Sequence, residues 1–158
     1  MEGMKRILLA EDSVQDAELT LTALDEFHLA DQVVIVRDGV EALDYLHQRG
    51  PFVRASDENP LVVILDLKMP KIDGLEVLKR MKSDPKLKCI PVVMLTSSRE
   101  ERDLIESYQL GVNAYVVKPV DFHQFLEAVK RLGIFWALVN EPPPGSAGRV
   151  APVNAPAQ

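Results

Sequence analysis

Residues 61–76 read LVVILDLKMPKIDGLE, and this stretch combines the signals that decide the fold. Leu61–Leu65 is an apolar run without polar alternation, which is typical of a parallel strand covered on both faces. Asp66 follows the run directly. Asp73 and Glu76 then form a capping-box pattern, in which the first side chain accepts from a free amide of the first helical turn. The stretch therefore predicts a buried strand, a polar loop and a helix.

The same alternation recurs along the chain. Further apolar runs predict strands at Ile7–Ala10, Val33–Val36, Val92–Leu95 and Tyr115–Val117. Capping patterns follow these runs at Ser13-x-x-Asp16, Asp38-x-x-Glu41, Ser98-x-x-Glu101 and Asp121-x-x-Gln124. A helical stripe is predicted from Val14, Ala17, Leu21 and Leu24. Because strands and helices alternate, we expect a parallel sheet with right-handed crossovers, a doubly wound (βα)₅ α/β protein with three layers.

Composition limits the class of protein. The chain has 158 residues, which is the length of one domain. Its net charge of −6 argues against a nucleic-acid-binding protein, which would need a basic patch. The single cysteine excludes an internal disulfide and fits a cytoplasmic protein, and no apolar run is long enough to span a membrane. Residues 140–158 are rich in proline and alanine and are predicted to be a disordered tail, which leaves 1–139 as the folded domain.

Polar residues follow the predicted strands at one edge of the sheet. Glu11 and Asp12 follow the first run, Asp66 the third, Thr96 the fourth and Lys118 the fifth. In open α/β sheets, sites form at the carboxyl ends of the strands. The three carboxylates and one ammonium leave a formal charge of −2, which a divalent cation would offset. Because every donor is oxygen, Mg²⁺ is preferred over Zn²⁺.

Four motifs taken together resemble the receiver domain of two-component response regulators. The resemblance extends over residues 4–138, and its motifs are ILLAED at 7–12, ILDLKMPKIDG at 64–74, MLTS at 94–97 and GVNAYVVKP at 111–119. It implies the flavodoxin-like receiver fold, with strand order 2-1-3-4-5. It also implies a phosphoacceptor protein that catalyses its own aspartyl phosphorylation, and not an enzyme acting on a separate substrate.

The resemblance assigns the acidic residues. Asp66 matches the phosphoacceptor. Asp12 and Asp66 match direct Mg²⁺ ligands, together with the backbone carbonyl of Lys68, and Glu11 matches a residue that acts through a metal-bound water.

The remaining matches concern the switch. Thr96 matches the switch hydroxyl, which moves toward the phosphoryl group. Tyr115 matches the switch aromatic residue, which rotates into the space that the hydroxyl leaves. Lys118 matches the phosphate partner, and its bond to Pro119 is expected to be cis. The positions of Lys68 and Ser98 flank the hydrolytic water in receivers. Because neither residue is a carboxylate or an amide, we predict slow self-dephosphorylation.

The end of the domain predicts a homodimer. Residues 134–139 are apolar on every side of a helix, and one sheet can bury only one stripe. The expected contact residues are Ile134, Phe135, Trp136 and Leu138. This ending and the long segment at 50–60 are similar to stand-alone receivers that serve bacterial phytochromes and related sensor histidine kinases. The downstream target is a protein that the sequence does not identify.

Three alternatives remain beside a terminal response regulator. A phosphorelay shuttle would pass the group from Asp66 to a histidine phosphotransfer protein. A receiver-like scaffold would signal by binding alone, although none of the expected site residues is missing. A haloacid-dehalogenase-type phosphatase would show Asp-x-Asp at the nucleophile, whereas this strand ends Asp66-Leu67-Lys68.

Overall fold

Five parallel strands form one sheet in the order β2-β1-β3-β4-β5. The computed structural model describes residues 6–53, 59–98, 100–101, 103, 110, 114–134 and 137–138. Its strands are β1 Ile7–Ala10, β2 Val33–Val36, β3 Val62–Asp66, β4 Val92–Thr96 and β5 Ala114–Val117. The predicted strands and their order are confirmed, with ends shifted by at most one residue.

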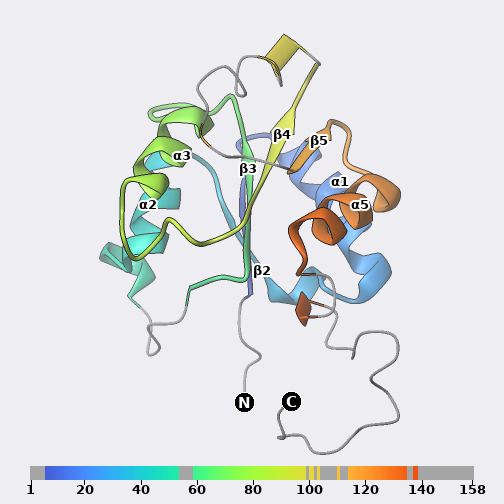
Figure 1. Cartoon of the computed structure of the whole chain (residues 1–158), viewed down its shortest axis with the longest axis horizontal. Coiled ribbons are helices and arrows are strands. Elements are labelled where there is room, and N and C mark those ends of the chain that lie inside the picture. The colour runs from blue at the N-terminus through green and yellow to red at the C-terminus, as the bar shows by residue number, and fades with distance from the viewer. Residues whose placement is uncertain are drawn as a thin grey trace, which may run out of the picture.

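Helices cover both faces of the sheet. The α-helices are α1 Val14–Leu24, α2 Gly39–His47, α3 Gly74–Lys82 and α5 Phe122–Leu132, and short 3₁₀ turns lie at Asp25–Phe27, Ala30–Gln32 and Gly50–Phe52. Figure 1 shows α2 and α3 on one face of the sheet and α1 and α5 on the other, as a doubly wound fold requires. Within the described residues, none of these helices has the length and apolar character needed to cross a membrane.

Each of these four α-helices begins at a predicted cap. The side chains of Ser13, Asp38, Asp73 and Asp121 each accept a hydrogen bond from the amide three residues later. Ser98 does the same for Glu101, at 3.3 Å. Because these caps come directly after strands or their short loops, the four described α-helices start at the same edge of the sheet.

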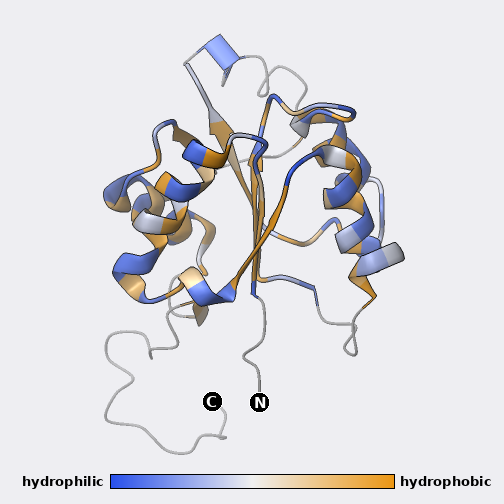
Figure 2. Ribbon diagram, turned by 180° about the vertical axis from the view of Figure 1, so that it is seen from behind, coloured by the Kyte–Doolittle hydropathy of each residue, from blue (hydrophilic) through white to orange (hydrophobic). Residues whose placement is uncertain are grey.

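Alternate residues of one strand enter different cores. In β3, Val63 and Leu65 pack with α2 and α3, whereas Val62 and Ile64 pack with α1 and α5. Figure 2 shows the hydrophobic sides of the helices turned toward the sheet. The unbroken apolar run of β3 therefore reflects burial on both faces.

The buried stripe predicted for α1 is wrong at Val14. Val14 is 53% exposed, and α1 buries Ala17, Thr20, Ala23 and Leu24. Thr20 can be buried in this core because its hydroxyl donates a hydrogen bond to the carbonyl of Asp16, at 3.0 Å.

Leu138 is not available as a dimer contact, because it is 1% exposed and packs within the core beneath α1 and α5. Ile134 is half-buried against the same core. Arg6 also donates a hydrogen bond to the carbonyl of Ala137, which ties this segment to the start of β1. Phe135, Trp136 and the tail at 140–158 lie outside the described residues, as do residues 54–58 of the long segment before β3.

Candidate functional site

The carboxyl ends of four strands position the candidate residues. Ala10 of β1 is level with Leu65 of β3, so Glu11 and Asp66 occupy neighbouring positions at the sheet edge. Thr96 ends β4, and its carbonyl accepts a 2.8 Å hydrogen bond from the amide of Lys118. Residues from opposite ends of the chain therefore meet above the sheet.

Three carboxylates gather at this edge. Oxygen atoms of Glu11, Asp12 and Asp66 all lie within 4.8 Å of one another. Glu11 and Asp66 are buried and Asp12 is exposed, so the group is open to solvent on one side. Glu11 is held in place by the amide of Ser13, which donates to its carboxylate at 3.1 Å. This all-oxygen donor set fits a hard divalent cation such as Mg²⁺.

Lys118 binds several of the acidic side chains at once. Its Nζ lies 3.1 Å from Oε1 of Glu11, 3.2 Å from Oδ2 of Asp66 and 2.9 Å from Oδ2 of Asp16. The Lys118–Pro119 peptide bond is cis. With Asp12, four carboxylates and one ammonium give this pocket a formal charge of −3. A cation would therefore relieve repulsion within the pocket.

Burial and like charges shift the pKa values of these groups. Desolvation, and then the charge of Asp66, raise the pKa of Glu11 to about 7. Desolvation also raises the pKa of Asp66, although Lys118 opposes the shift. Burial disfavours a charge on Lys118, but its hydrogen bond to Asp16 and the charges of Asp66 and Glu11 outweigh burial and raise its pKa. The lysine is thus a permanent cation beside carboxylates that hold protons more tightly than usual.

Thr96 carries a hydroxyl that the described residues leave without a partner. The residue is 0% exposed, and its Oγ1 makes no hydrogen bond within the described part of the chain. A buried hydroxyl without a partner costs on the order of 1–3 kcal/mol. This hydroxyl therefore suits an oxygen acceptor that arrives at the strand ends. Tyr115, the other predicted switch residue, is half-buried on β5 opposite Met94.

The loops around Asp66 are closely fitted. A Cβ added to Gly74 would lie 2.1 Å from the carbonyl oxygen of Asp66, so α3 begins directly against the backbone of the candidate acceptor. Lys68 forms an ion pair with Glu101, with Nζ and Oε2 3.1 Å apart. Partial burial of Glu101 works against its charge, but the Ser97 amide and Lys68 together lower its pKa. This pair joins the β3–α3 loop to the segment after β4.

Sequence reasoning missed two carboxylates near this site. The sequence pattern assigns Asp16 and Glu101 only to the last positions of capping patterns. In the structure, Asp16 binds Lys118 and Glu101 binds Lys68. Asp16 follows Asp12 by four residues at the start of α1, and this spacing was the one available signal.

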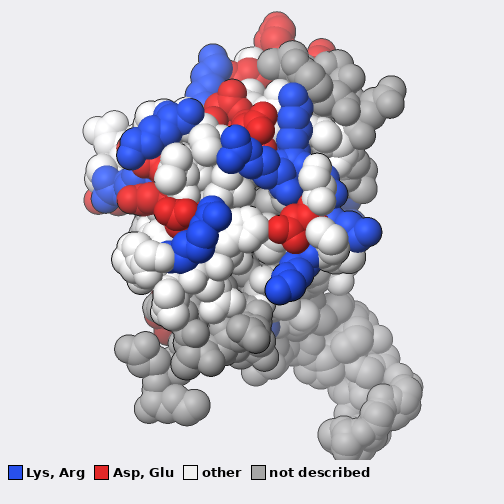
Figure 3. All heavy atoms as spheres, turned by 90° about the vertical axis from the view of Figure 1, so that its left-hand side faces the viewer, with Lys and Arg blue, Asp and Glu red and all other residues white. Residues whose placement is uncertain are grey.

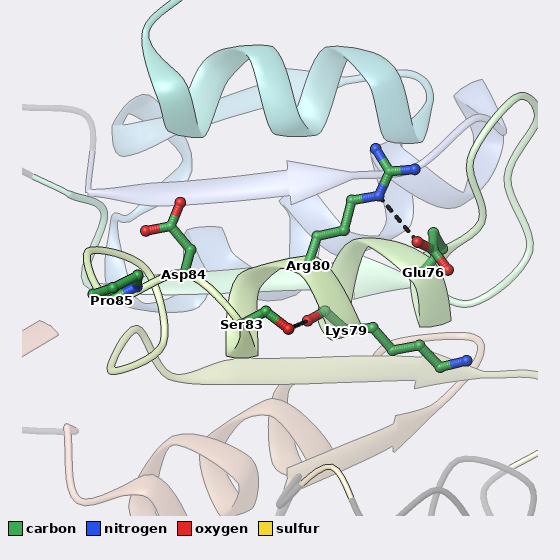
Figure 4. Close-up of a pocket in the computed structure, with 6 residues that line it drawn as sticks. All are labelled: Glu76, Lys79, Arg80, Ser83, Asp84 and Pro85. Atoms are coloured by element: carbon green, nitrogen blue, oxygen red, sulfur yellow. Dashed lines mark hydrogen bonds and ion pairs between the residues drawn. The ribbon is translucent and has the colours of Figure 1, made fainter.

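The face formed by α2 and α3 shows mixed charge and a separate pocket. Figure 3 views the side of α2 and α3, where basic and acidic side chains are interspersed, and ion pairs join Arg80 to Glu76 and Lys71 to Asp38. A pocket of about 440 Å³ lies along α3 and the following loop, away from the carboxylates (Figure 4). It is lined by Glu76, Lys79, Arg80, Ser83, Asp84 and Pro85.

The fold and the carboxylate site at the strand ends define the class of this protein. It is a flavodoxin-like α/β protein with an acidic site and a lysine at the strand ends. The sequence matches the family model of the response regulator receiver domain over residues 7–130. The chain belongs to this family.

The relatives similar to this chain include response regulators that are named for phytochromes. Response regulator Rcp1 of Synechocystis is 40% identical over 84% of this chain and 88% of its own length. A Mn²⁺-bound structure of Rcp1 covers 82% of this chain and 92% of that one with a TM-score of 0.64. The bacteriophytochrome response regulator RtBRR has a TM-score of 0.81 and 57% identity, over 92% of this chain and 88% of its own. A structure of a phosphorylated cyanobacterial phytochrome response regulator, RcpA, has a TM-score of 0.67 and 44% identity. It covers 85% of this chain and 95% of its own.

Proposed function

We propose that this receiver accepts a phosphoryl group on Asp66 from a phosphohistidine of a sensor kinase and signals through altered protein contacts. One arrangement carries the proposal. The carboxylate of Asp66 lies 3.2 Å from the Lys118 ammonium. At the end of the neighbouring strand β4, the buried hydroxyl of Thr96 has no partner among the described residues. Cation and hydroxyl are the two groups that a newly formed aspartyl phosphate needs.

The proposed chemistry uses the chain's own side chains. An oxygen of Asp66 attacks phosphorus, the bond from phosphorus to the donor imidazole nitrogen breaks, and its electron pair stays on the ring. Lys118 pairs with a phosphoryl oxygen and Thr96 donates to another. In-line transfer of this kind depends mainly on positioning and on stabilising charge. The chain is thus the phosphoacceptor and promotes its own modification, and it has no separate substrate.

A divalent metal fits the same pocket. Glu11, Asp12 and Asp66 offer oxygen atoms within 4.8 Å of one another, and we assign the backbone carbonyl of Lys68 to the same set. Mg²⁺ bound there would neutralise charge on the acceptor and phosphoryl oxygens. The Mn²⁺-bound structure of the relative Rcp1 supports a divalent cation in receivers of this kind, and we propose Mg²⁺ for this chain.

Phosphorylation would change the β4–β5 side of the protein. It adds charge and three acceptor oxygens at Asp66. We expect Thr96 to move toward one of these oxygens and Tyr115 to turn into the space that Thr96 leaves. The surface formed by β5 and α5 would then carry the signal to a protein partner.

The relatives indicate the kind of kinase. RtBRR, RcpA and Rcp1 are response regulators, and the first two are named for phytochrome signalling. We therefore propose that a bacterial phytochrome histidine kinase phosphorylates this chain in the cytoplasm. We also retain a homodimer through the segment after α5 as a proposal, with half-buried Ile134 as its described contact candidate.

Intact-mass spectrometry tests the central step. Wild type and Asp66→Asn are incubated with acetyl phosphate, with and without Mg²⁺, and separately with an autophosphorylated phytochrome kinase. We expect one phosphoryl adduct that requires Mg²⁺ and is absent from Asp66→Asn. Lack of an adduct with both donors, in protein that remains folded, would overturn the proposal in favour of a binding scaffold.

A further inference from the structure

We propose that Asp16, in the first turn of α1, is a positioning residue that restrains Lys118 and releases it to the phosphoryl group. This inference rests on the proposed function. Asp16 Oδ2 lies 2.9 Å from Lys118 Nζ, closer than the carboxylate of Asp66 at 3.2 Å. The resting site therefore shares its cation between α1 and the phosphoacceptor.

Lys118 is already engaged by three carboxylates before phosphorylation. An ammonium has three N–H bonds, and carboxylates of Glu11, Asp16 and Asp66 lie within 3.2 Å of Nζ. A phosphoryl oxygen on Asp66 must compete with these acceptors for a donor. One of the existing contacts must then lengthen or break.

Burial indicates which contact is given up. The Glu11 side chain is 0% exposed, so loss of the lysine would leave a buried charge unpaired. The Asp16 side chain is 36% exposed, so water can replace the ammonium there. The contact with Asp16 is therefore the least costly to release.

The backbone fixes Asp16 in its restraining position. Its amide donates to the Ser13 hydroxyl at 3.1 Å, and its carbonyl accepts from the hydroxyl of buried Thr20 at 3.0 Å. The carboxylate therefore projects from a capped and packed helical turn. Asp16 also stands outside the group of three carboxylates that could hold a metal, so its role differs from theirs.

A double-mutant cycle tests this role. The probe is beryllofluoride with Mg²⁺, an analogue of the phosphoryl group, titrated into wild type, Asp16→Asn, Lys118→Met and the double variant. Asp16→Asn should tighten beryllofluoride binding roughly three- to five-fold, the scale of one half-exposed ion pair. The gain should vanish in the Lys118→Met background, because no lysine is left to restrain. Initial rates of labelling by acetyl phosphate provide the same cycle where binding is too weak to titrate.

Two controls separate the possible outcomes. Glu18→Gln removes an exposed acid from the same helix and should leave binding unchanged. An unchanged or weakened affinity in Asp16→Asn, or an equal gain with and without Lys118, would overturn the restraining role. If wild type does not bind beryllofluoride, or if Asp66→Asn still binds it, the proposed function fails and not the role of Asp16 alone.

Discussion

Lys118 and Asp66 lie 3.2 Å apart, ammonium to carboxylate, although β4 separates the strands that carry them. The contact crosses the top of β4, where Thr96 is buried. Lys118 is itself anchored by its amide, which donates to the Thr96 carbonyl at 2.8 Å. Acceptor, hydroxyl and cation are therefore joined into one unit by the sheet.

Removing the lysine charge should separate phosphorylation from metal binding. In Lys118→Met, labelling of Asp66 by acetyl phosphate should fall about ten-fold or more, equivalent to ~1.4 kcal/mol of lost transition-state stabilisation. Mg²⁺ should bind at least as tightly as in wild type, because a cation has left the pocket. Mass spectrometry measures the first effect and titration calorimetry the second. Loss of both labelling and Mg²⁺ binding would indicate a collapsed site.

The buried carboxylate of Glu11 should make stability depend on pH when no metal is present. Its pKa in the folded protein is about 7, above its ordinary value of 4.5, so the folded state binds this proton more tightly than the unfolded state. The cost of the charged form is fully present above about pH 7 and disappears as the pH falls toward 4.5. The free energy of unfolding of the metal-free protein should therefore decrease as the pH rises from about 4.5 to 7.

Glu11→Gln isolates that contribution. At pH 8 without metal, the variant should be more stable than wild type by about 1–3 kcal/mol, and the difference should shrink near pH 5. Urea unfolding monitored by circular dichroism measures both values. Glu18→Gln, the same chemical change at an exposed acid of α1, is the matched control and should keep the wild-type difference in stability between pH 5 and pH 8. Equal stability of wild type and Glu11→Gln at pH 8 would show that the charge is compensated.

The lifetime of the phosphoryl group should be long. Lys68 lies two residues after Asp66, and its ammonium is engaged by Glu101 at 3.1 Å. Ser98 caps the following turn. Neither side chain offers a carboxylate or an amide to orient a hydrolytic water. Lys68→Asn should shorten the half-life several-fold, measured by loss of the adduct over time in Mg²⁺ buffer.

Lys68→Met is the matched control for that change. It also breaks the ion pair with Glu101, but it supplies no amide. If both variants shorten the lifetime equally, the ion pair controls hydrolysis and the water-orienting explanation is wrong.

Local sequence signals predicted most of the fold and the principal site. The apolar runs and the caps act within a few residues, and parallel pairing then brings Glu11, Asp66 and Lys118 to one edge without further information. Asp16 could not be assigned in this way, because its contact with Lys118 depends on how α1 is rotated against β5. The same rotation exposes Val14 and buries Thr20, whose hydroxyl is satisfied by its own helix. Apolar periodicity does not determine that rotation when the buried residues are small or polar.

The burial of Leu138 distinguishes a core residue from an interface residue. The side chain is 1% exposed and packs in the core beneath α1 and α5, and its amide donates to the carbonyl of Ile134 at 2.9 Å. Leu138→Ala should lower the free energy of unfolding by about 2–4 kcal/mol through lost burial and a residual cavity. The loss should be the same at low and high protein concentration, because it arises within one chain. Thermal unfolding over a hundred-fold range of concentration measures this, with light scattering to follow the oligomeric state. A destabilisation that appears only at concentrations where the wild type self-associates would instead place Leu138 in a dimer interface.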